Sequence, residues 1–100
     1  MKYGRRDANH KDLIADYRAL GCSVADTADL GKGVPDCFVG CAGVTDPVEF
    51  KADRGKLRDA QREFSADWRG SKIWVIKKRD DVIAHVNDMR NRACTSAKRS

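Results

Sequence analysis

The sequence contains no apolar run near the roughly 18 residues that a membrane-spanning helix needs. Its first ten residues are polar where a secretory signal peptide would be apolar. It has only 2 prolines, and its 41% hydrophobic and 35% charged residues exclude a low-complexity or disordered chain. We therefore expect a soluble globular protein in the cytoplasm, with no membrane association.

Cysteines are few, and their spacing does not indicate a zinc site. The four cysteines include no C-x-x-C pair, although Cys37 and Cys41 are spaced i and i+4 around a strand-like run. We interpret Cys22 and Cys37 as small buried hydrophobic residues with reduced thiols. A metal or disulfide role is the less favoured alternative.

The length and the charge of the chain limit the class of protein. One hundred residues form one modest core, so we expect a single domain over residues 1–100. The net charge is +5, and residues 51–100 hold 14 basic and 7 acidic groups against 6 and 8 in residues 1–50. A basic half next to carboxylates is what an enzyme that cuts nucleic acid needs, because phosphates must be attracted to an acidic site. A basic solvated face on an unrelated small protein is the alternative.

Hydrophobic spacing and turn residues predict the element order α-β-β-β-α-β-α. The predicted elements are a helix at about 8–20 capped by Asp7 or Asn9, strands at 22–25, 37–39 and 48–50, a helix at 57–68, a strand at 73–76, and a last helix capped by Asp80 or Asp81. The continuous apolar run 73–76 predicts a strand that is buried on both faces, inside the sheet. A basic arm is expected at 1–6 and a frayed basic tail at 90–100.

The two strands at 37–39 and 48–50 are expected to form a β-hairpin. Gly40, Gly43, Asp46 and Pro47 separate the two strands and are all turn formers. Because side chains alternate along a strand, Glu49 and Lys51 share one face, while Val48 and Phe50 point to the other. Asp36, at the start of the first strand, can then lie across the ladder from Glu49 or Lys51.

This group of charges predicts a metal site. Two neighbouring carboxylates, Asp36 and Glu49, repel each other unless a cation lies between them, and their hard oxygen atoms suit Mg²⁺ or Mn²⁺. Lys51 beside such an ion can hold an attacking water or stabilise negative charge in the transition state, which fits phosphodiester hydrolysis. The alternative is an ordinary edge hairpin whose solvent face carries a glutamate and a lysine.

These residues resemble a known signature. Pro35-Asp36 followed, thirteen residues after Asp36, by Glu49-Phe50-Lys51 is similar to the P-D…(D/E)-x-K pattern of the PD-(D/E)XK nuclease superfamily. More narrowly, the chain resembles the small virus-type replication-repair nucleases, the VRR-NUC family, whose pattern runs G-x-P-D, E-x-K and then a helix with a glutamine. Here these are Gly33-Val34-Pro35-Asp36, Glu49-Phe50-Lys51 and Gln61, and the resemblance covers about residues 7–86.

The resemblance implies a restriction-endonuclease-like α/β fold with an αβββαβα core, in which a mixed central sheet is flanked by helices. It implies that Asp36, Glu49 and the backbone carbonyl of Phe50 bind Mg²⁺ or Mn²⁺. Lys51 would assist the attacking water, and Gln61 would face the site and orient the lysine or the phosphate. The alternative for Gln61 is a polar residue on the flank of a helix.

One position departs from the family pattern. Many members carry a glutamate in the first helix, and here the polar candidates are Asp7, Asn9, His10 and Asp12. His10 is a possible accessory residue, as a water-mediated metal ligand or a proton carrier. The alternative is a solvent-exposed histidine at a helix N-terminus.

The function implied by the resemblance is that of a metal-dependent endodeoxyribonuclease acting on structured or branched DNA, such as Holliday junctions or flaps. Its setting would be recombination, replication or repair, in bacterial cytoplasm or in the host of a phage. Symmetric cleavage of a junction would need a homodimer, for which Tyr3, Tyr17 or Trp74 could supply apolar surface. The expected DNA contacts are Arg54, Lys56, Arg58 and Arg62. The alternatives are a non-catalytic DNA-binding module on the same fold and a small protein-interaction domain.

Overall fold

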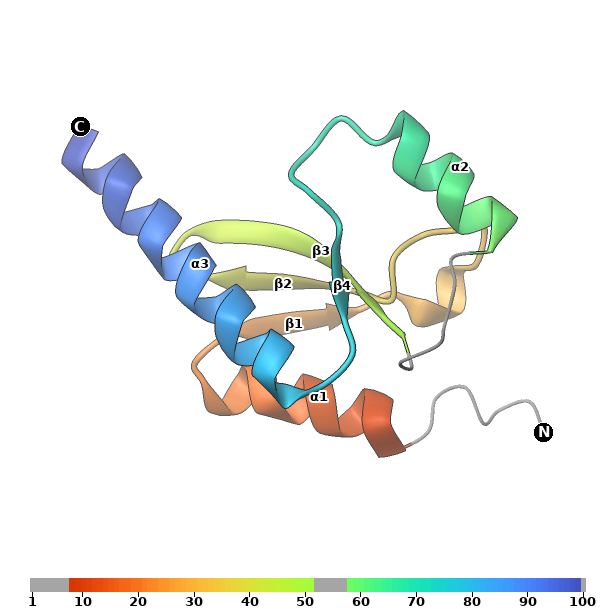
Figure 1. The fold of residues 1–100 in the computed structure, drawn as a ribbon, viewed down its shortest axis with the longest axis horizontal. Coiled ribbons are helices and arrows are strands. Elements are labelled where there is room, and N and C mark those ends of the chain that lie inside the picture. Colours follow the sequence, from red (N-terminus) through yellow and green to blue (C-terminus); the bar gives the residue numbers. More distant parts are fainter. Residues whose placement is uncertain (1–7, 52–57, 100) are drawn as a thin grey trace.

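The computed structural model describes residues 8–51 and 58–99, with side chains over 9–51 and 58–95. The element order agrees with the one predicted. The elements are α1 (Ala8–Ala19), β1 (Ser23–Asp26), the 3₁₀ helix η2 (Ala28–Leu30), β2 (Cys37–Cys41), β3 (Val44–Phe50), α2 (Asp59–Asp67), β4 (Trp74–Ile76) and α3 (Arg79–Arg99) (Figure 1). The predicted arm 1–6 and the proposed cap Asp7 lie outside the described residues.

The strands form a mixed sheet in the order β1-β2-β3-β4. β1, β2 and β3 are successively antiparallel, and β4 is parallel to β3, with Glu49 beside Val75. A parallel neighbour needs a crossover, which here contains α2. This arrangement confirms the expected α/β fold with a mixed sheet flanked by helices.

The β2–β3 hairpin is present, but its turn is shorter than predicted. Ala42 and Gly43 make the turn with φ values of 54° and 84°, and a pair of positive φ angles matches the twist of a two-residue hairpin. The prediction that Asp46 and Pro47 are turn residues was wrong, because both lie inside β3. β3 is therefore long enough to carry Asp46 and Glu49 on opposite faces.

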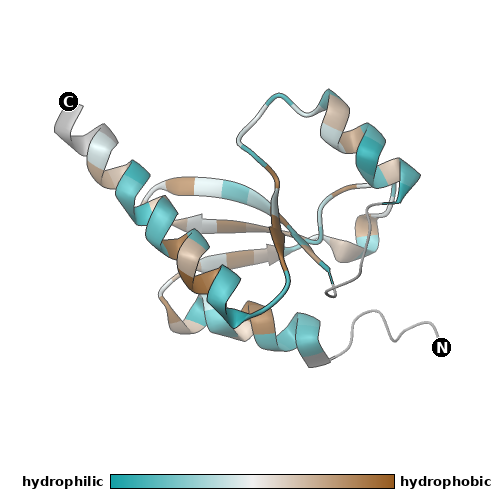
Figure 2. Ribbon diagram, viewed as in Figure 1, coloured by the Kyte–Doolittle hydropathy of each residue, from teal (hydrophilic) through white to brown (hydrophobic). Residues whose placement is uncertain are grey.

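α1 and α3 cover one face of the sheet. The hydrophobic core lies between these two helices and the sheet. Figure 2 shows hydrophobic residues along β4 and a mixture of hydrophilic and hydrophobic residues along α2 and α3. Each fully buried aliphatic side chain in such a core contributes roughly 1.5–3 kcal/mol. The core comprises Leu13, Tyr17, Cys22, Cys37, Val39, Cys41, Val48, Ile76, Val82, Val86 and Met89. Cys22 and Cys37 are buried, free thiols, as expected.

β4 lies at the edge of the sheet that the described residues form, and not inside it as the sequence predicted. Its Ile76 is buried, whereas Val75 is 42% exposed. Trp74 faces α3, where its ring stacks on His85 at 4.3 Å between centroids. The apolar run is thus explained by a core on one face and a partly open hydrophobic surface on the other.

The last helix departs from the prediction at both ends. α3 begins at Arg79 and runs to Arg99, so the tail expected to be frayed is helical. Asp81 lies inside the helix, and its Oδ2 accepts hydrogen bonds from the backbone N–H groups of Lys77 at 2.8 Å and Lys78 at 3.2 Å. The carboxylate therefore fixes the turn that leads into the helix, and the helix starts two or three residues earlier than it would with a cap at Asp80 or Asp81.

A buried polar network ties α1, β3 and α3 together. The Tyr17 hydroxyl lies 2.7 Å from His85 Nδ1, and His85 Nε2 lies 2.7 Å from Oδ2 of Asp46. Arg92 donates to both carboxylate oxygens of Asp46. Tyr17 is 0% exposed, so the expectation that it offers surface to a partner was wrong. The network needs the helix faces of α1 and α3 to meet at β3, which spacing along the chain does not reveal.

Within the described ranges, every helix is too short or too polar to cross a membrane.

Candidate active site

The fold brings Asp36 and Glu49 together at one end of the β2–β3 ladder. Cys37 pairs with Val48, so Asp36, one residue before, lies opposite Glu49. The backbone N–H of Asp36 donates to Glu49 Oε1 at 3.1 Å, and the backbone N–H of Phe50 donates to Asp36 Oδ2 at 2.8 Å. Each carboxylate is thus held by the backbone of the opposite strand.

Glu49 is the buried member of the pair, with 2% of its surface exposed. Burial and then the negative charge of Asp36 raise the pKa of Glu49 to about 7, while Lys51 acts in the opposite direction. A charged group that is withdrawn from water and placed beside a like charge is stabilised by a cation. The geometry therefore favours a positive charge at these two carboxylates.

Gln61 connects Glu49 to Lys51. Its Oε1 accepts from Lys51 Nζ at 2.9 Å and from the backbone N–H of Arg58 at 2.8 Å, and its Nε2 donates to Oε2 of Glu49. Arg58 is the residue at the N-cap of α2, so the first turn of this helix holds the side chain of Gln61 in place. Gln61 is 7% exposed, which argues against its being a polar residue on a helix flank.

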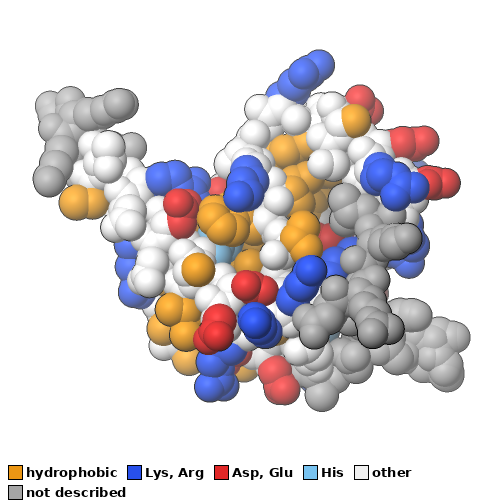
Figure 3. Space-filling view, viewed as in Figure 1, with side chains coloured by type: hydrophobic (Ala, Val, Ile, Leu, Met, Phe, Trp, Pro, Cys, Tyr) orange, Lys and Arg blue, Asp and Glu red, His pale blue; other side chains and the backbone are white. Residues whose placement is uncertain are grey.

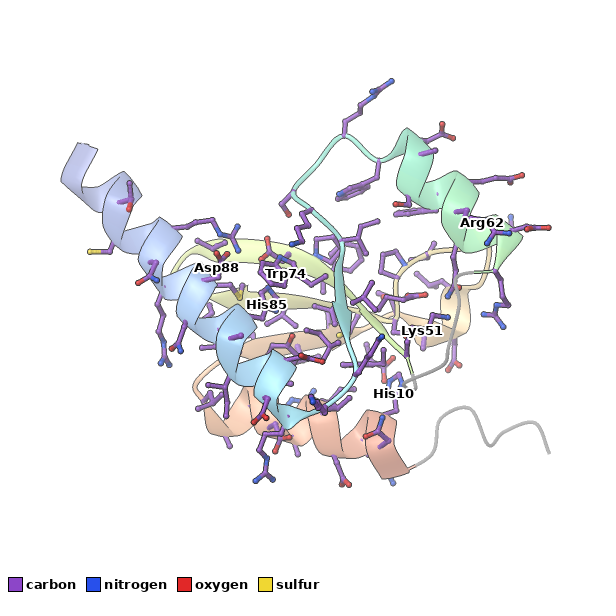
Figure 4. All side chains as sticks on the ribbon, in the orientation of Figure 1. His10, Lys51, Arg62, Trp74, His85 and Asp88 are labelled. Carbon is purple, nitrogen blue, oxygen red and sulfur yellow. The ribbon has the colours of Figure 1, made fainter. Side chains whose placement is uncertain are left out.

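α2 contacts the sheet on the face opposite the core. Glu49 and Val48 point to opposite faces, and Glu49 meets α2 through Gln61, while Val48 belongs to the core. The helix is anchored there by Trp68, whose ring lies 5.5 Å from Phe64 and 6.2 Å from Phe38 of β2. The catalytic candidates therefore lie between a strand end and a helix start, as Figure 4 shows for Lys51 below α2.

His10 lies close to the site but is not exposed. It is 6% exposed, and its ring makes an edge contact with Phe50 at 4.7 Å between centroids. The alternative of a solvent-exposed histidine was wrong, because the first turn of α1 lies against the end of β3, where the His10 ring contacts Phe50 (Figure 4). Its role as an accessory residue stays a prediction.

Two of the expected DNA contacts can be placed. Arg58 and Arg62 are exposed at the start of α2, and Arg62 forms an ion pair with Asp59 one turn away. Arg54 and Lys56 lie outside the described residues. Arg58 and Arg62 both lie at the start of the helix that carries Gln61. Two positively charged side chains are therefore close to the carboxylates.

A pocket opens between α2 and β4 beside these residues, and we name it the α2–β4 pocket. Figure 3 shows hydrophobic side chains gathered in a hollow at this place. The pocket is lined by Gly33, Pro35, Glu49, Gln61, Ser65, Ile73 and Val75. Ser65, Ile73 and Val75 were not among the site residues predicted from the sequence. Their spacing could have indicated them. Ser65 follows Gln61 by four residues and so shares its helix face, and Ile73 and Val75 are two residues apart and so share a face of an extended segment.

The donor set fits a hard divalent ion. Two carboxylates on neighbouring strands offer oxygen ligands, and Mg²⁺ in proteins is commonly held by one or two carboxylates with water and substrate phosphate in the remaining positions. Over residues 8–51 and 58–99 no cluster of three His, Cys, Asp or Glu side chains could hold a metal.

No protein-family model matches the sequence, and no curated protein does so. Among solved structures, the chain is similar to one described as "VRR_NUC domain", with a TM-score of 0.59 and 25% sequence identity. The match covers 78% of this chain and 89% of that one, and it indicates a nuclease-type function. It agrees with the three ordered motifs around Asp36, Glu49 and Gln61 and supports membership of this chain in the VRR-NUC family.

Proposed function

We propose that the protein is a Mg²⁺- or Mn²⁺-dependent endodeoxyribonuclease that hydrolyses phosphodiester bonds in branched DNA. The observation that carries the proposal is the linked group Asp36, Glu49, Gln61 and Lys51. The backbone N–H of Asp36 and the side-chain amide of Gln61 both donate to the Glu49 carboxylate, and the Lys51 ammonium donates to Gln61. Asp36 and Glu49 would hold the ion, with the Phe50 carbonyl as a further ligand. When bound, the ion supplies positive charge to the phosphate oxygens.

Lys51 would stabilise charge that develops on the phosphate. Its Nζ is fixed by Gln61 at 2.9 Å, and the Lys51 backbone N–H donates to the carbonyl of Ile76 at 3.1 Å. A lysine held at both ends loses little further freedom when substrate binds, so its charge is available for the transition state. Gln61 is the positioning residue for both Lys51 and Glu49.

DNA is the proposed partner because positively charged side chains lie next to the carboxylates. Arg58 and Arg62 flank Gln61 on the exposed side of α2, and phosphates bound there would lead the backbone toward the carboxylates. Symmetric cleavage of a four-way junction needs two such sites, so we propose a homodimer for that substrate.

The test is cleavage of linear duplex, flap and four-way DNA in Mg²⁺, Mn²⁺, Ca²⁺ or EDTA. We expect cutting of branched DNA in Mg²⁺ and Mn²⁺, binding without cutting in Ca²⁺, and no cutting in EDTA. Undiminished turnover in excess EDTA would refute the metal dependence. Binding of DNA without cutting in any metal would favour the non-catalytic DNA-binding module instead.

A further inference from the structure

The α2–β4 pocket shares two residues with the proposed active site. Glu49 and Gln61 form one wall, while Pro35, Ile73 and Val75 contribute apolar surface and Ser65 adds a hydroxyl. Val75 lies beside Glu49 because the register of the parallel β3–β4 pair sets them opposite each other. Any group in the pocket is thus a direct neighbour of a group bound at the carboxylates.

The lining of the pocket favours a neutral ligand over an anion. None of the described lining residues is a lysine or an arginine, and Glu49 contributes a carboxyl group. A phosphate would therefore meet apolar atoms and negative charge. A flat, neutral ring with polar edges fits better, because its faces can contact Pro35, Ile73 and Val75 while its edge reaches the Ser65 hydroxyl.

DNA offers such a ring next to every phosphate. If a scissile phosphate lies at Asp36 and Glu49, the base attached to the same nucleotide is within reach of the adjoining pocket. A base that is stacked and paired in a duplex cannot enter a pocket, whereas an unpaired one enters at a lower cost in unstacking energy. The pocket thus distinguishes between phosphodiester bonds by the pairing of the adjacent nucleotide.

We propose that the α2–β4 pocket binds the base of one unpaired nucleotide next to the scissile phosphate, so that the enzyme cuts where a base is free to leave the duplex. This inference rests on the proposed function. It narrows the substrate class to flaps, strand ends and the open centres of junctions. It also assigns Ser65, Ile73 and Val75 as specificity-determining residues.

The test fills the pocket from its exposed side. Ser65→Trp places an indole ring in the pocket from the surface of α2, and Ala66→Trp is the matched control, because Ala66 is exposed on the same helix and does not line the pocket. Each protein cuts a flap with a normal nucleotide or an abasic analogue at either position flanking the scissile bond. In parallel, 2-aminopurine at those positions reports base burial in Ca²⁺.

We expect the abasic analogue at one position to lower kcat/KM of the wild-type protein about tenfold or more, which is the size of effect found when a base loses its stacking partner. Ser65→Trp should cut both substrates at the lower rate and lose the fluorescence change, and Ala66→Trp should behave as wild type. Equal cleavage of normal and abasic flaps by the wild type would refute base binding in the pocket, and the proposed nuclease activity would still stand. If nothing is cut, the proposed function fails, and the fluorescence alone then decides whether the base enters the pocket.

Discussion

Gly33 lies so close to Ala60 that a Cβ atom on Gly33 would come within 2.1 Å of the Ala60 carbonyl oxygen. The φ angle of Gly33 is 78°, a conformation that glycine adopts without strain. The loop before Asp36 therefore touches the backbone of α2 one residue before Gln61. A residue in the first motif thus sets the position of the helix that carries the third.

Gly33→Ala should lower cleavage by about 10²-fold, because a shift of α2 by about 1 Å displaces Gln61 from Lys51 and Glu49. The matched control is Gly31→Ala, which has a similar φ of 70° but no atom within 4 Å of its added Cβ. Both variants place an alanine at a positive φ angle and so carry similar backbone strain. Only the added Cβ of Gly33→Ala collides with α2. Equal activity of the two variants in a single-turnover assay would contradict this role.

Asp36→Asn should abolish most cleavage yet keep or tighten DNA binding. It removes a negative charge near the phosphate and also a hard ligand for the ion. The measurement is single-turnover cleavage of a four-way junction beside a calorimetric Mn²⁺ titration, with circular dichroism to check folding. Normal cleavage by this variant would refute the assigned site.

Lys51→Ala should leave Mn²⁺ binding intact, since both carboxylates remain, and slow the chemical step by about 10²-fold or more. Gln61→Ala should be milder, because its amide orients Lys51 and Glu49 without supplying charge. The same pair of assays separates the two effects. If Lys51→Ala cut DNA normally, the lysine would have no part in the mechanism, although the metal site could still stand.

DNA affinity should fall steeply between low and physiological salt, because phosphate contacts release counterions. Arg58→Ala should reduce the slope of log K against log salt by about 1. Arg18→Ala is the control, since Arg18 is exposed on α1 and donates to the Val24 carbonyl away from the site. A slope that Arg58→Ala leaves unchanged would place the DNA elsewhere.

The contribution of His85 to stability should decrease below about pH 6.5, whereas the raised pKa of Glu49 acts in the opposite direction over the same range. Burial lowers the pKa of His85 and outweighs the hydrogen bond to Asp46. Burial alone would raise the pKa of Asp46, yet hydrogen bonds from Arg92 and His85 lower it. As the pH falls, the unfolded chain therefore binds a proton at each of these groups before the folded protein does. This happens at His85 near neutral pH and at Asp46 in the acid range, and each step favours unfolding.

The loss from His85 can reach about 1.4 kcal/mol per pH unit below its unfolded pKa. The difference between wild type and His85→Gln in urea unfolding at pH 7.5 and 5.5 measures it, because the opposite contribution of Glu49 is common to both proteins. An NMR titration gives the direct check. A His85 pKa at or above its ordinary value in the folded protein would contradict the prediction.

The sequence by itself determined the element order and the meeting of Asp36 with Glu49. Both follow from rules that act over short distances along the chain: alternation on a strand, turn chemistry and one hairpin. The charge pattern likewise placed the basic residues in the second half of the chain. Even here the turn was placed too widely, because Asp46 and Pro47 are common in turns and here belong to a strand.

Tertiary structure alone decided how the elements meet. The contact of Gln61 with Glu49 and Lys51 depends on where α2 docks, and the edge position of β4 depends on which strand it joins. The His85 and Asp46 pair is separated by 39 residues. Such contacts are selected by the packing of whole faces against one another, which no local pattern encodes, and the α2–β4 pocket exists only because a helix and an edge strand meet beside Glu49.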